Sequence, residues 1–287
     1  MSAEPDRAGH AAMVAFSAGR VWALVLRYIY LLKGSWPRIL ELAYWPSVQI
    51  VLWGFIAKYF VSGDGAGGDT GGGSLVAEAA GALLAAVLLW DILFRGQLGY
   101  TISFLEELWS RNLGQLFVSP LRPYEMVLSL TTISLIRTLV GVGPAALLAI
   151  PLYGFSIFDL GLPLLVFFAN LMVTGWALGL FVTAILLRVG LGAESVAWMA
   201  LFLIAPFSAI YYPVSVLPEW LQPVAWMLPP AYVFEGMRAI LFDNVFRGDL
   251  LLGAVLLNLV YLLLGGIAFI VSFRVARRTG LLHQTGE

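Results

Sequence analysis

The stretch Leu160–Leu187 reads LGLPLLVFFANLMVTGWALGLFVTAILL and includes no charged side chain. An α-helix needs roughly 20 consecutive apolar residues to cross the ~30 Å hydrocarbon core of a bilayer. The stretch is long enough, and it lacks the apolar–polar alternation of a membrane β-barrel strand. It therefore predicts a transmembrane helix.

The rest of the sequence repeats this pattern. Of its 287 residues, 61% are hydrophobic and only 11% are charged, whereas a soluble domain is roughly half apolar and a quarter charged. Six apolar stretches predict an all-α polytopic membrane protein with six transmembrane helices. The fifth is short and contains Pro206, so we expect a kink there. The stretches are Ala43–Val61, Leu75–Phe94 (extending at most to Gln97), Met126–Ile150, Leu160–Leu187, Ser195–Tyr212 and Leu250–Phe273.

Composition excludes several classes of function. The net charge of −1 provides no basic face for nucleic acid. Without cysteine, disulfides and Cys-ligated metals are excluded. The two histidines, His10 and His283, lie near the termini, so we expect no metal site and no catalytic residues. The opening MSAEPDRAGHAA lacks the basic and apolar regions of a signal peptide.

The distribution of lysine and arginine predicts the orientation. Twelve of these residues lie near span ends on one side and three on the other, which places both termini in the cytoplasm. We expect one transmembrane domain over residues 1–287, with a cytoplasmic or interfacial region 1–38, a six-helix region 39–273 and a cytoplasmic tail 274–287. Phe16–Trp36 is amphipathic and should lie along the inner membrane surface. The glycine-rich Gly63–Gly73 then becomes an outside loop, more plausibly a solvated tether than a ligand-binding loop.

A charged segment, FLEELWSRNLGQLFVSPLRPYE, runs from Phe104 to Glu125 between spans two and three. Its periodicity predicts a surface helix over Leu105–Val118, with an apolar stripe and with Glu106 and Glu107 directed toward water or a partner. Pro120 should end this helix, and Pro123 suits the first turn of the next. Periodicity leaves two interpretations open: an interfacial connector or a helix that docks a cytoplasmic protein.

The segment before the last span, Tyr211–Leu241, is divided by prolines and rich in aromatic residues. This composition predicts re-entrant or interfacial helices at the outer leaflet. Glu235 and Arg238 are three residues apart and should pair on one helix face. The segment is either a structural cap or an outer gate.

Two motifs in this order resemble the permeases of type-2 ATP-binding-cassette (ABC) exporters. The first is the acidic pair followed by Arg111 and LFVSPLRPYE, and the second is YYPVSVLPEWLQPVAWMLPPAYVFEGMRAIL. The resemblance covers nearly the whole chain. It implies the transmembrane permease subunit of an ABC exporter, multi-pass in a bacterial inner membrane, dimeric and bound to two P-loop ATPase subunits. It also implies an ATPase-coupling helix and an outer gate. The coupling residues are Glu106, Glu107, Trp109, Arg111 and Asn112, and the gate residues are Glu235, Arg238, Trp220 and Tyr232.

The chain contains no G-x-x-x-x-G-K-[ST] motif, so it should bind no cofactor itself, and ATP and Mg should belong to the partner. Three ionisable residues fall within spans: Asp91, Arg95 and Arg137. We expect a buried pair or triad rather than substrate contact, because an unpaired charge at membrane depth is costly. The substrate expected is a hydrophobic drug, lipid or glycolipid-like molecule, with a lipid-linked polysaccharide as the rival. A stand-alone secondary transporter or channel is the alternative outside this class, although no internal repeat supports it.

Overall fold

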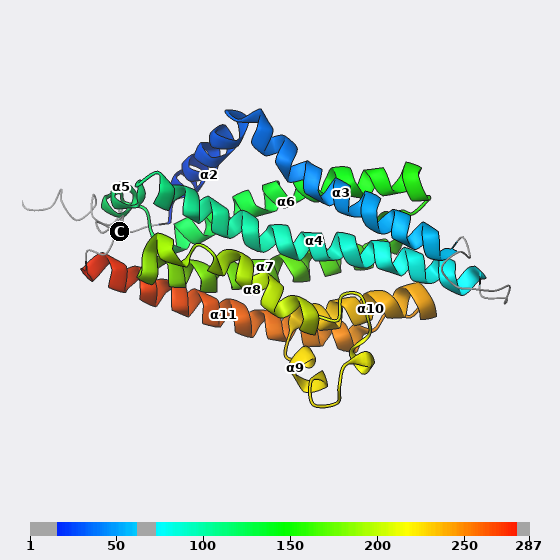
Figure 1. Cartoon of the computed structure of the whole chain (residues 1–287). Coiled ribbons are helices and arrows are strands. Elements are labelled where there is room, and N and C mark those ends of the chain that lie inside the picture. Colours follow the sequence, from blue (N-terminus) through cyan, green and yellow to red (C-terminus); the bar gives the residue numbers. More distant parts are fainter. Residues whose placement is uncertain (1–15, 62–72, 280–287) are drawn as a thin grey trace, which may run out of the picture.

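The computed structural model describes residues 16–61 and 73–279, and every regular element in these ranges is helical. Five helices are long and apolar enough to cross a membrane, and they lie side by side as a bundle (Figure 1). The predicted class, an all-α polytopic membrane protein, is confirmed. Predictions for residues 1–15, 62–72 and 280–287 lie outside the described residues. The five helices are α3 (Trp36–Val61), α4 (Gly73–Trp109), α6 (Pro123–Tyr153), α7 (Leu162–Val189) and α11 (Gly248–Thr279).

Helix α4 is the centre of the bundle. It packs against α3, α6 and α7, and 72% of its most apolar stretch is buried, compared with 17% for α3 and 22% for α11. In Figure 1, α3 and α11 lie on opposite sides of α4. The apolar outer faces of α3 and α11 are therefore available to lipid, while α4 contacts mainly protein.

Glycines allow α7 to approach α4 closely. A Cβ atom at Gly175 would lie 2.9 Å from the backbone nitrogen of Gln97, and one at Gly179 would lie 2.7 Å from the ring of Tyr100. The two glycines are four residues apart, which is the small-residue spacing that brings membrane helices together.

Buried polar side chains join α7 to α11. The Thr174 hydroxyl donates to the Asn258 side-chain oxygen (2.7 Å), and the Asn258 amide donates to the Asn170 carbonyl (3.0 Å). Such hydrogen bonds between membrane helices contribute about 0.6–2 kcal/mol each.

The fifth predicted span differs most from the structure. It forms only α8 (Val196–Ile204) and the 3₁₀ helix η3 (Ala205–Phe207). These twelve residues extend roughly 18 Å, too short for a ~30 Å bilayer core. Pro206 lies in η3, and the positive φ of Ala209 (53°) follows directly, so the helix cannot continue.

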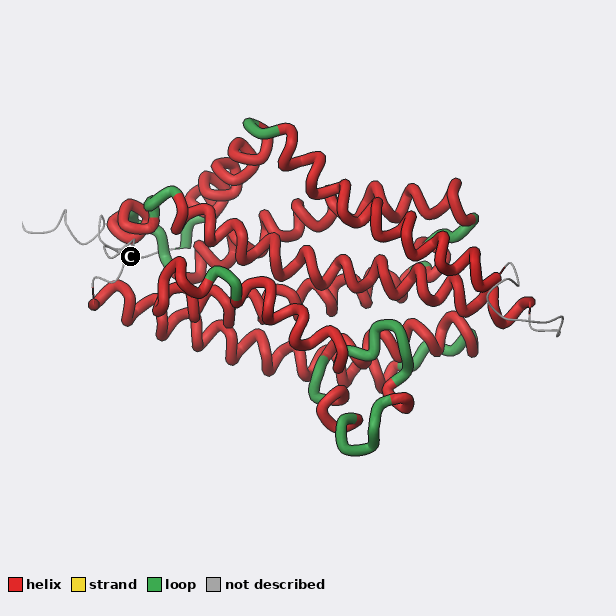
Figure 2. The backbone as a smooth tube through the Cα atoms, in the orientation of Figure 1, coloured by secondary structure: helices red, strands yellow, loops and turns green. Residues whose placement is uncertain are grey.

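After η3 the chain forms an irregular segment with short helices before the last long helix, α11, begins. The longest irregular stretch follows η3, as Figure 2 shows, and α11 brings the chain back to the end of the bundle where α5 (Leu113–Val118) lies (Figure 1). Short helices form before the last span, as predicted, and their re-entrant or interfacial position at the outer leaflet stays a prediction. The remaining elements are η1 (Ile157–Leu160), η2 (Gly190–Ala193), η4 (Val214–Val216), α9 (Gln222–Trp226) and α10 (Pro229–Asp243).

Helix α4 also extends well beyond the predicted end of span two. It continues to Trp109, and Arg111 then adopts a left-handed conformation (φ 53°) that ends it. The single helix predicted over Leu105–Val118 is therefore wrong, because its first turn belongs to α4 and the rest forms α5 (Leu113–Val118). The prolines act as predicted: α5 ends before Pro120, and Pro123 begins α6.

The amphipathic N-terminal stretch forms a separate helix, α2 (Ala18–Lys33), ahead of α3. It buries Leu24, Val25 and Tyr28 and packs against α6 and α3. The predicted helix is thus confirmed, and it is held by protein contacts as well as by any membrane surface.

Replacing Gly175 with alanine should destabilise the bundle. The new methyl would meet the backbone of α4, which cannot rotate away as a side chain does, and overpacking costs about 1–3 kcal/mol. Gly266→Ala is the matched control, because nothing lies within 4 Å of that position. We expect Gly175→Ala alone to lower the thermal unfolding midpoint in detergent. Equal midpoints for the two variants would contradict this packing.

Candidate functional site: two cavities along helix α4

A cavity of about 600 Å³ lies near the α5 end of the bundle, between α3, α4, α6 and α8. We call it the charged cavity. Its size is within the range of small-molecule binding sites, about 300–1,000 Å³. Its charged lining residues are Arg38, Glu41, Arg95, Glu106 and Arg137.

Glu106 is paired inside the protein. Both of its carboxylate oxygens accept from the Arg137 guanidinium, at 3.0 and 2.9 Å, and Arg38 donates at 3.3 Å. Arg137 is buried, with 4% of its surface exposed. The expectation that Glu106 projects toward water or a partner is therefore wrong, since it neutralises a buried arginine.

Arg137 pairs with Glu106 and forms no ion pair with Asp91, the acid of the expected buried triad. Helix α6 runs antiparallel to α4, with Ser134 hydrogen-bonded to the carbonyl of Gly96 (2.6 Å). Side chains lean toward the N-terminus of their own helix. On antiparallel helices Glu106 and Arg137 therefore lean toward each other, whereas Asp91 leans away.

Asp91 and Arg95 belong to none of the ion pairs in the described part of the chain. Asp91 is 1% exposed, and one of its carboxylate oxygens has no hydrogen-bond partner there. The predicted buried pair or triad is therefore not formed as direct ion pairs among the described residues, although Asp91 and Arg95 are near enough to interact electrostatically. Arg95 instead lines the charged cavity.

Glu107 faces α2 rather than the solvent. Its side chain is fully buried and pairs with Arg27 at 2.9 Å. Burial, together with the Glu107 charge, raises the pKa of the Tyr28 phenol well above its ordinary value, so this hydroxyl stays protonated at physiological pH. The outward orientation predicted for Glu107 is wrong, because α2 covers this face of α4.

A second buried acid fixes α2 to α6. Glu125 accepts from the Arg20 guanidinium at 2.6 and 2.9 Å and from the Ser17 backbone N–H at 2.9 Å. The Ser129 hydroxyl also donates to the Val21 carbonyl at 3.2 Å. Sequence patterning missed Glu125 as a functional candidate. Its only signal was a carboxylate three residues after a helix N-cap.

The other predicted coupling residues form the turn between α4 and α5. Trp109 is 45% exposed, and its indole N–H donates to Glu194 at 3.2 Å. Arg111 is exposed, and Asn112 is partly so. These three residues are accessible to a partner, and their docking role stays a prediction.

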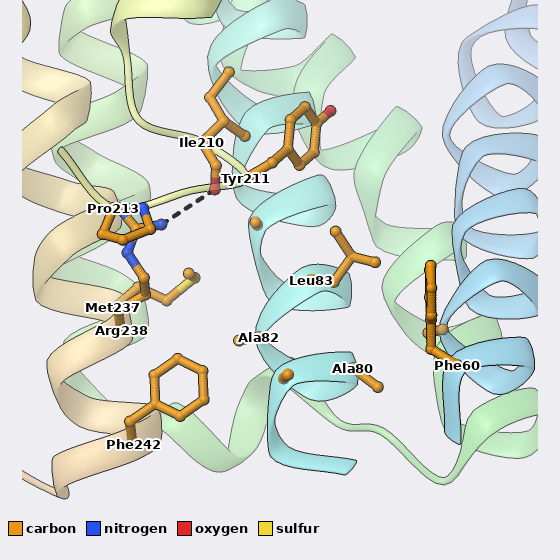
Figure 3. Close-up of a pocket in the computed structure, with 13 residues that line it drawn as sticks. Phe60, Ala80, Ala82, Leu83, Ile210, Tyr211, Pro213, Met237, Arg238 and Phe242 are labelled. Carbon is orange, nitrogen blue, oxygen red and sulfur yellow. Dashed lines mark hydrogen bonds between the residues drawn. The ribbon is translucent and has the colours of Figure 1, made fainter. Parts of the chain in front are cut away.

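A second cavity, of about 530 Å³, lies near the α10 end of the bundle. We call it the apolar cavity. Figure 3 shows Leu83 of α4, Phe60 of α3 and Phe242 of α10 on three of its sides. Small side chains of α4 create the space, namely Ala79, Ala80, Ala82 and Ala86.

Glu235 and Arg238 fasten the irregular segment onto α10. They pair at 3.2 Å, as predicted. The Val214 N–H donates to Glu235 at 2.6 Å, and Arg238 donates to the carbonyls of Ala209 (2.8 Å) and Ile210 (3.3 Å; Figure 3). The two charges thus hold one wall of the apolar cavity.

The two aromatic residues grouped with this pair lie in different surroundings. Trp220 is 74% exposed on the segment between α8 and α10. Tyr232 packs edge-on against Trp226, with ring centroids 4.8 Å apart, and its ring covers Gly253 on α11. The gate role predicted for these residues stays a prediction.

Two clusters of aromatic rings, which we together call the aromatic layer, lie where the two cavities approach each other: Tyr211 lines the apolar cavity and Phe94 lines the charged cavity. The layer consists of Trp53, Trp90, Phe94, Phe202 and Tyr211. Trp53 stacks on Tyr211 at 5.1 Å, and Phe94 contacts Trp90 and Phe202 at 6.3 Å each. These distances are typical of attractive ring pairs. Sequence analysis missed the layer, because its members come from separate elements whose relative depth depends on packing.

This architecture defines the class: a multi-pass membrane protein with two cavities along one central helix. A family model described as "ABC-2 type transporter" matches residues 20–242, and the chain belongs to this family. It is therefore the membrane permease component of an ABC transporter, and membership of this family implies an ATP-binding cassette partner. A search of curated proteins found no match.

Glu106→Gln should destabilise the protein by about 3 kcal/mol, because it leaves the buried Arg137 charge without its partner. Combining it with Arg137→Met should cost less than the two single changes together. The measurement is a double-mutant cycle of unfolding free energy in mixed detergent micelles. Asp249→Asn is the control, since its pair with Arg247 is exposed and screened by solvent, so its loss should change the unfolding free energy little. Additive effects of Glu106→Gln and Arg137→Met would contradict the buried pair.

Proposed function

We propose that the chain is the permease of an ATP-driven exporter that moves an amphipathic or hydrophobic molecule out of the cytoplasm or inner leaflet. The observation that carries the proposal is the arrangement along α4. An exposed turn, a charged cavity, an aromatic layer and an apolar cavity follow one another along this one helix. A displacement of α4 at the turn would change both cavities.

The proposed orientation places the α5 end in the cytoplasm of a bacterial cell, with both termini there and the apolar cavity toward the outside. The bias of lysine and arginine toward the α5 end supports it. The charged cavity then opens to the cytoplasmic side of the inner membrane. The apolar cavity becomes the exit.

The proposed assembly contains two copies of this chain and two P-loop ATPase subunits, which bind ATP and Mg. Trp109, Arg111 and Asn112 form the surface that the ATPase contacts. Glu106 and Glu107 act behind this surface, because they join α4 to α6 and α2. A push on the turn therefore reaches three helices at once.

In the proposed cycle, the aromatic layer separates the cavities until ATP binding moves α4. Substrate then passes to the apolar cavity and leaves past the segment held by Glu235 and Arg238, with Trp220 and Tyr232 beside it. Net export requires that the substrate bind the inward-facing state more tightly than the outward-facing state. A hydrophobic drug, a membrane lipid or a glycolipid fits the mixed lining.

Reversing the charge at Arg111 should uncouple the complex. Arg111→Asp changes an exposed charge at the turn, and aspartate tolerates the positive φ found there. In proteoliposomes with the partner ATPase, we expect at least tenfold less substrate-stimulated ATP hydrolysis and transport. The control is Arg278→Asp, an exposed change at the end of α11.

Two results would distinguish the proposed exporter from its alternatives. Unchanged ATP hydrolysis and transport would contradict coupling at this turn. Transport by the chain alone, without any ATPase, would instead indicate a stand-alone transporter or channel.

Thiol labelling should show that the two cavities open to opposite sides of the membrane. The chain has no cysteine, so single variants need no prior substitution. A membrane-impermeant maleimide should modify Ala79→Cys in intact cells and Glu41→Cys only in inverted vesicles. Labelling of both positions from the same side would contradict the proposed path.

A further inference from the structure

We propose that the charged cavity binds the anionic head group, a phosphate or carboxylate, of an amphiphilic substrate. The apolar tail of this substrate lies against the aromatic side chains that line the same cavity. This assignment rests on the proposed function, because it names the substrate class. The cavity contains three arginines, Arg38, Arg95 and Arg137, and two carboxylates, Glu41 and Glu106. Its lining therefore has an excess of one positive charge.

Arg95 is the arginine of this lining that makes no direct contact with a carboxylate of the described residues, although Asp91 and Glu41 are near enough to act on it electrostatically. Among the described residues it forms no ion pair, and its buried Nε has no hydrogen-bond partner. The Nε of Arg137 is also unpartnered, although its terminal nitrogen binds Glu106. An arginine without a directly bonded counter-ion is costly within a transmembrane helix. A bound anion would remove this cost.

The position of Arg95 is built into the packing. A Cβ at Gly141 of α6 would lie 2.8 Å from the Cδ of Arg95 and 3.0 Å from its Nε. Glycine at 141 thus makes the groove in which the arginine stem lies. Because the guanidinium is a planar fork of donors, it can bind two oxygens of a phosphate or carboxylate together.

The rest of the cavity suits an apolar tail. Trp45 of α3, Phe94 of α4 and Trp198 of α8 line it. Trp45 and Trp198 are 55% and 45% exposed, so the aromatic wall reaches the outer surface of the bundle. An amphiphile can therefore enter from the membrane with its head group directed at Arg95. A small hydrophilic anion would leave this wall without a partner.

The test uses the purified full-length chain in dodecyl maltoside micelles and a phosphatidic acid with a fluorescent acyl chain. Phosphatidylcholine with the same chain is the matched lipid. We expect tighter binding of phosphatidic acid and about tenfold weaker binding after Arg95→Gln, the loss of one charge-assisted contact. Arg95→Lys keeps the positive charge but not the planar pair of donors, so it should lose less affinity for phosphatidic acid than Arg95→Gln. Arg278→Gln, far from the cavity, should bind like the unmodified chain.

Several outcomes would overturn the proposal. These are equal binding of the two lipids, no effect of Arg95→Gln, or an equal loss of both lipids in a variant that still elutes as a folded species. Competition by millimolar inorganic phosphate alone would indicate a small-anion site instead. If the bound lipid is a transported substrate, trapping ATP on the complex of this chain with its partner ATPase should release the lipid from the cavity. If the binding of phosphatidic acid is the same with and without ATP, the lipid is a permanently bound one, and the substrate assignment is overturned.

The two proposals fail separately. Loss of the head-group preference while Arg111→Asp still uncouples the complex would refute only the substrate class. If the chain prefers phosphatidic acid to phosphatidylcholine but transports without any ATPase, only the proposal of an ATP-driven exporter is refuted.

Discussion

The constraint on which this structure depends is the cost of leaving a charge unpaired inside a membrane protein. Glu106, Glu107 and Glu125 all lie near the α5 end of the bundle, and each is paired with an arginine from another helix. Removing the partner of a charge buried on both sides, as in the pair of Arg137 and Glu106, costs about 3–5 kcal/mol. The pairs therefore fix the positions of α2, α4 and α6 relative to one another.

This constraint gives α4 its length and its role. With its acidic residues neutralised by α2 and α6, the helix continues to Trp109 without a break. One rigid element then joins the exposed turn at Arg111 to both cavities and to Trp90 and Phe94 of the aromatic layer. Glycines of α7 hold it close to the next helix. A force applied at the turn acts on the whole path.

Apolar length alone predicted the class and four of the five long helices to within about ten residues, because the membrane imposes that length. Proline positions predicted the end of α5 and the start of α6. The extension of α4 was not predictable, because residues 95–109 are polar enough to resemble a surface segment, and the arginines of α2 and α6 that neutralise Glu107 and Glu106 are distant in sequence. Pro206 indicated that the fifth predicted span would be interrupted. The shortness of its helix also depends on the positive φ of Ala209, which the sequence does not indicate.

The candidate site was less predictable than the fold. The pair Glu235–Arg238 is local in sequence, and helix periodicity identified it correctly. Arg137 and Glu106 are distant in sequence, and their contact depends on the register of α4 against α6 and on the lean of both side chains. Gly141 is one of many glycines until its contact with Arg95 is seen. Local spacing carries no information about such contacts.

The most direct test of the central claim is a distance measured across the charged cavity. Spin labels at Tyr44→Cys on α3 and Met199→Cys on α8 lie on exposed positions. The labelled chain would be diluted with unmodified chain, so that each complex carries at most one labelled copy. If α4 transmits the work of the ATPase, the distance distribution should shift by several ångströms when ATP is trapped. Identical distributions with and without ATP, in complexes that hydrolyse ATP and transport substrate, would contradict the account.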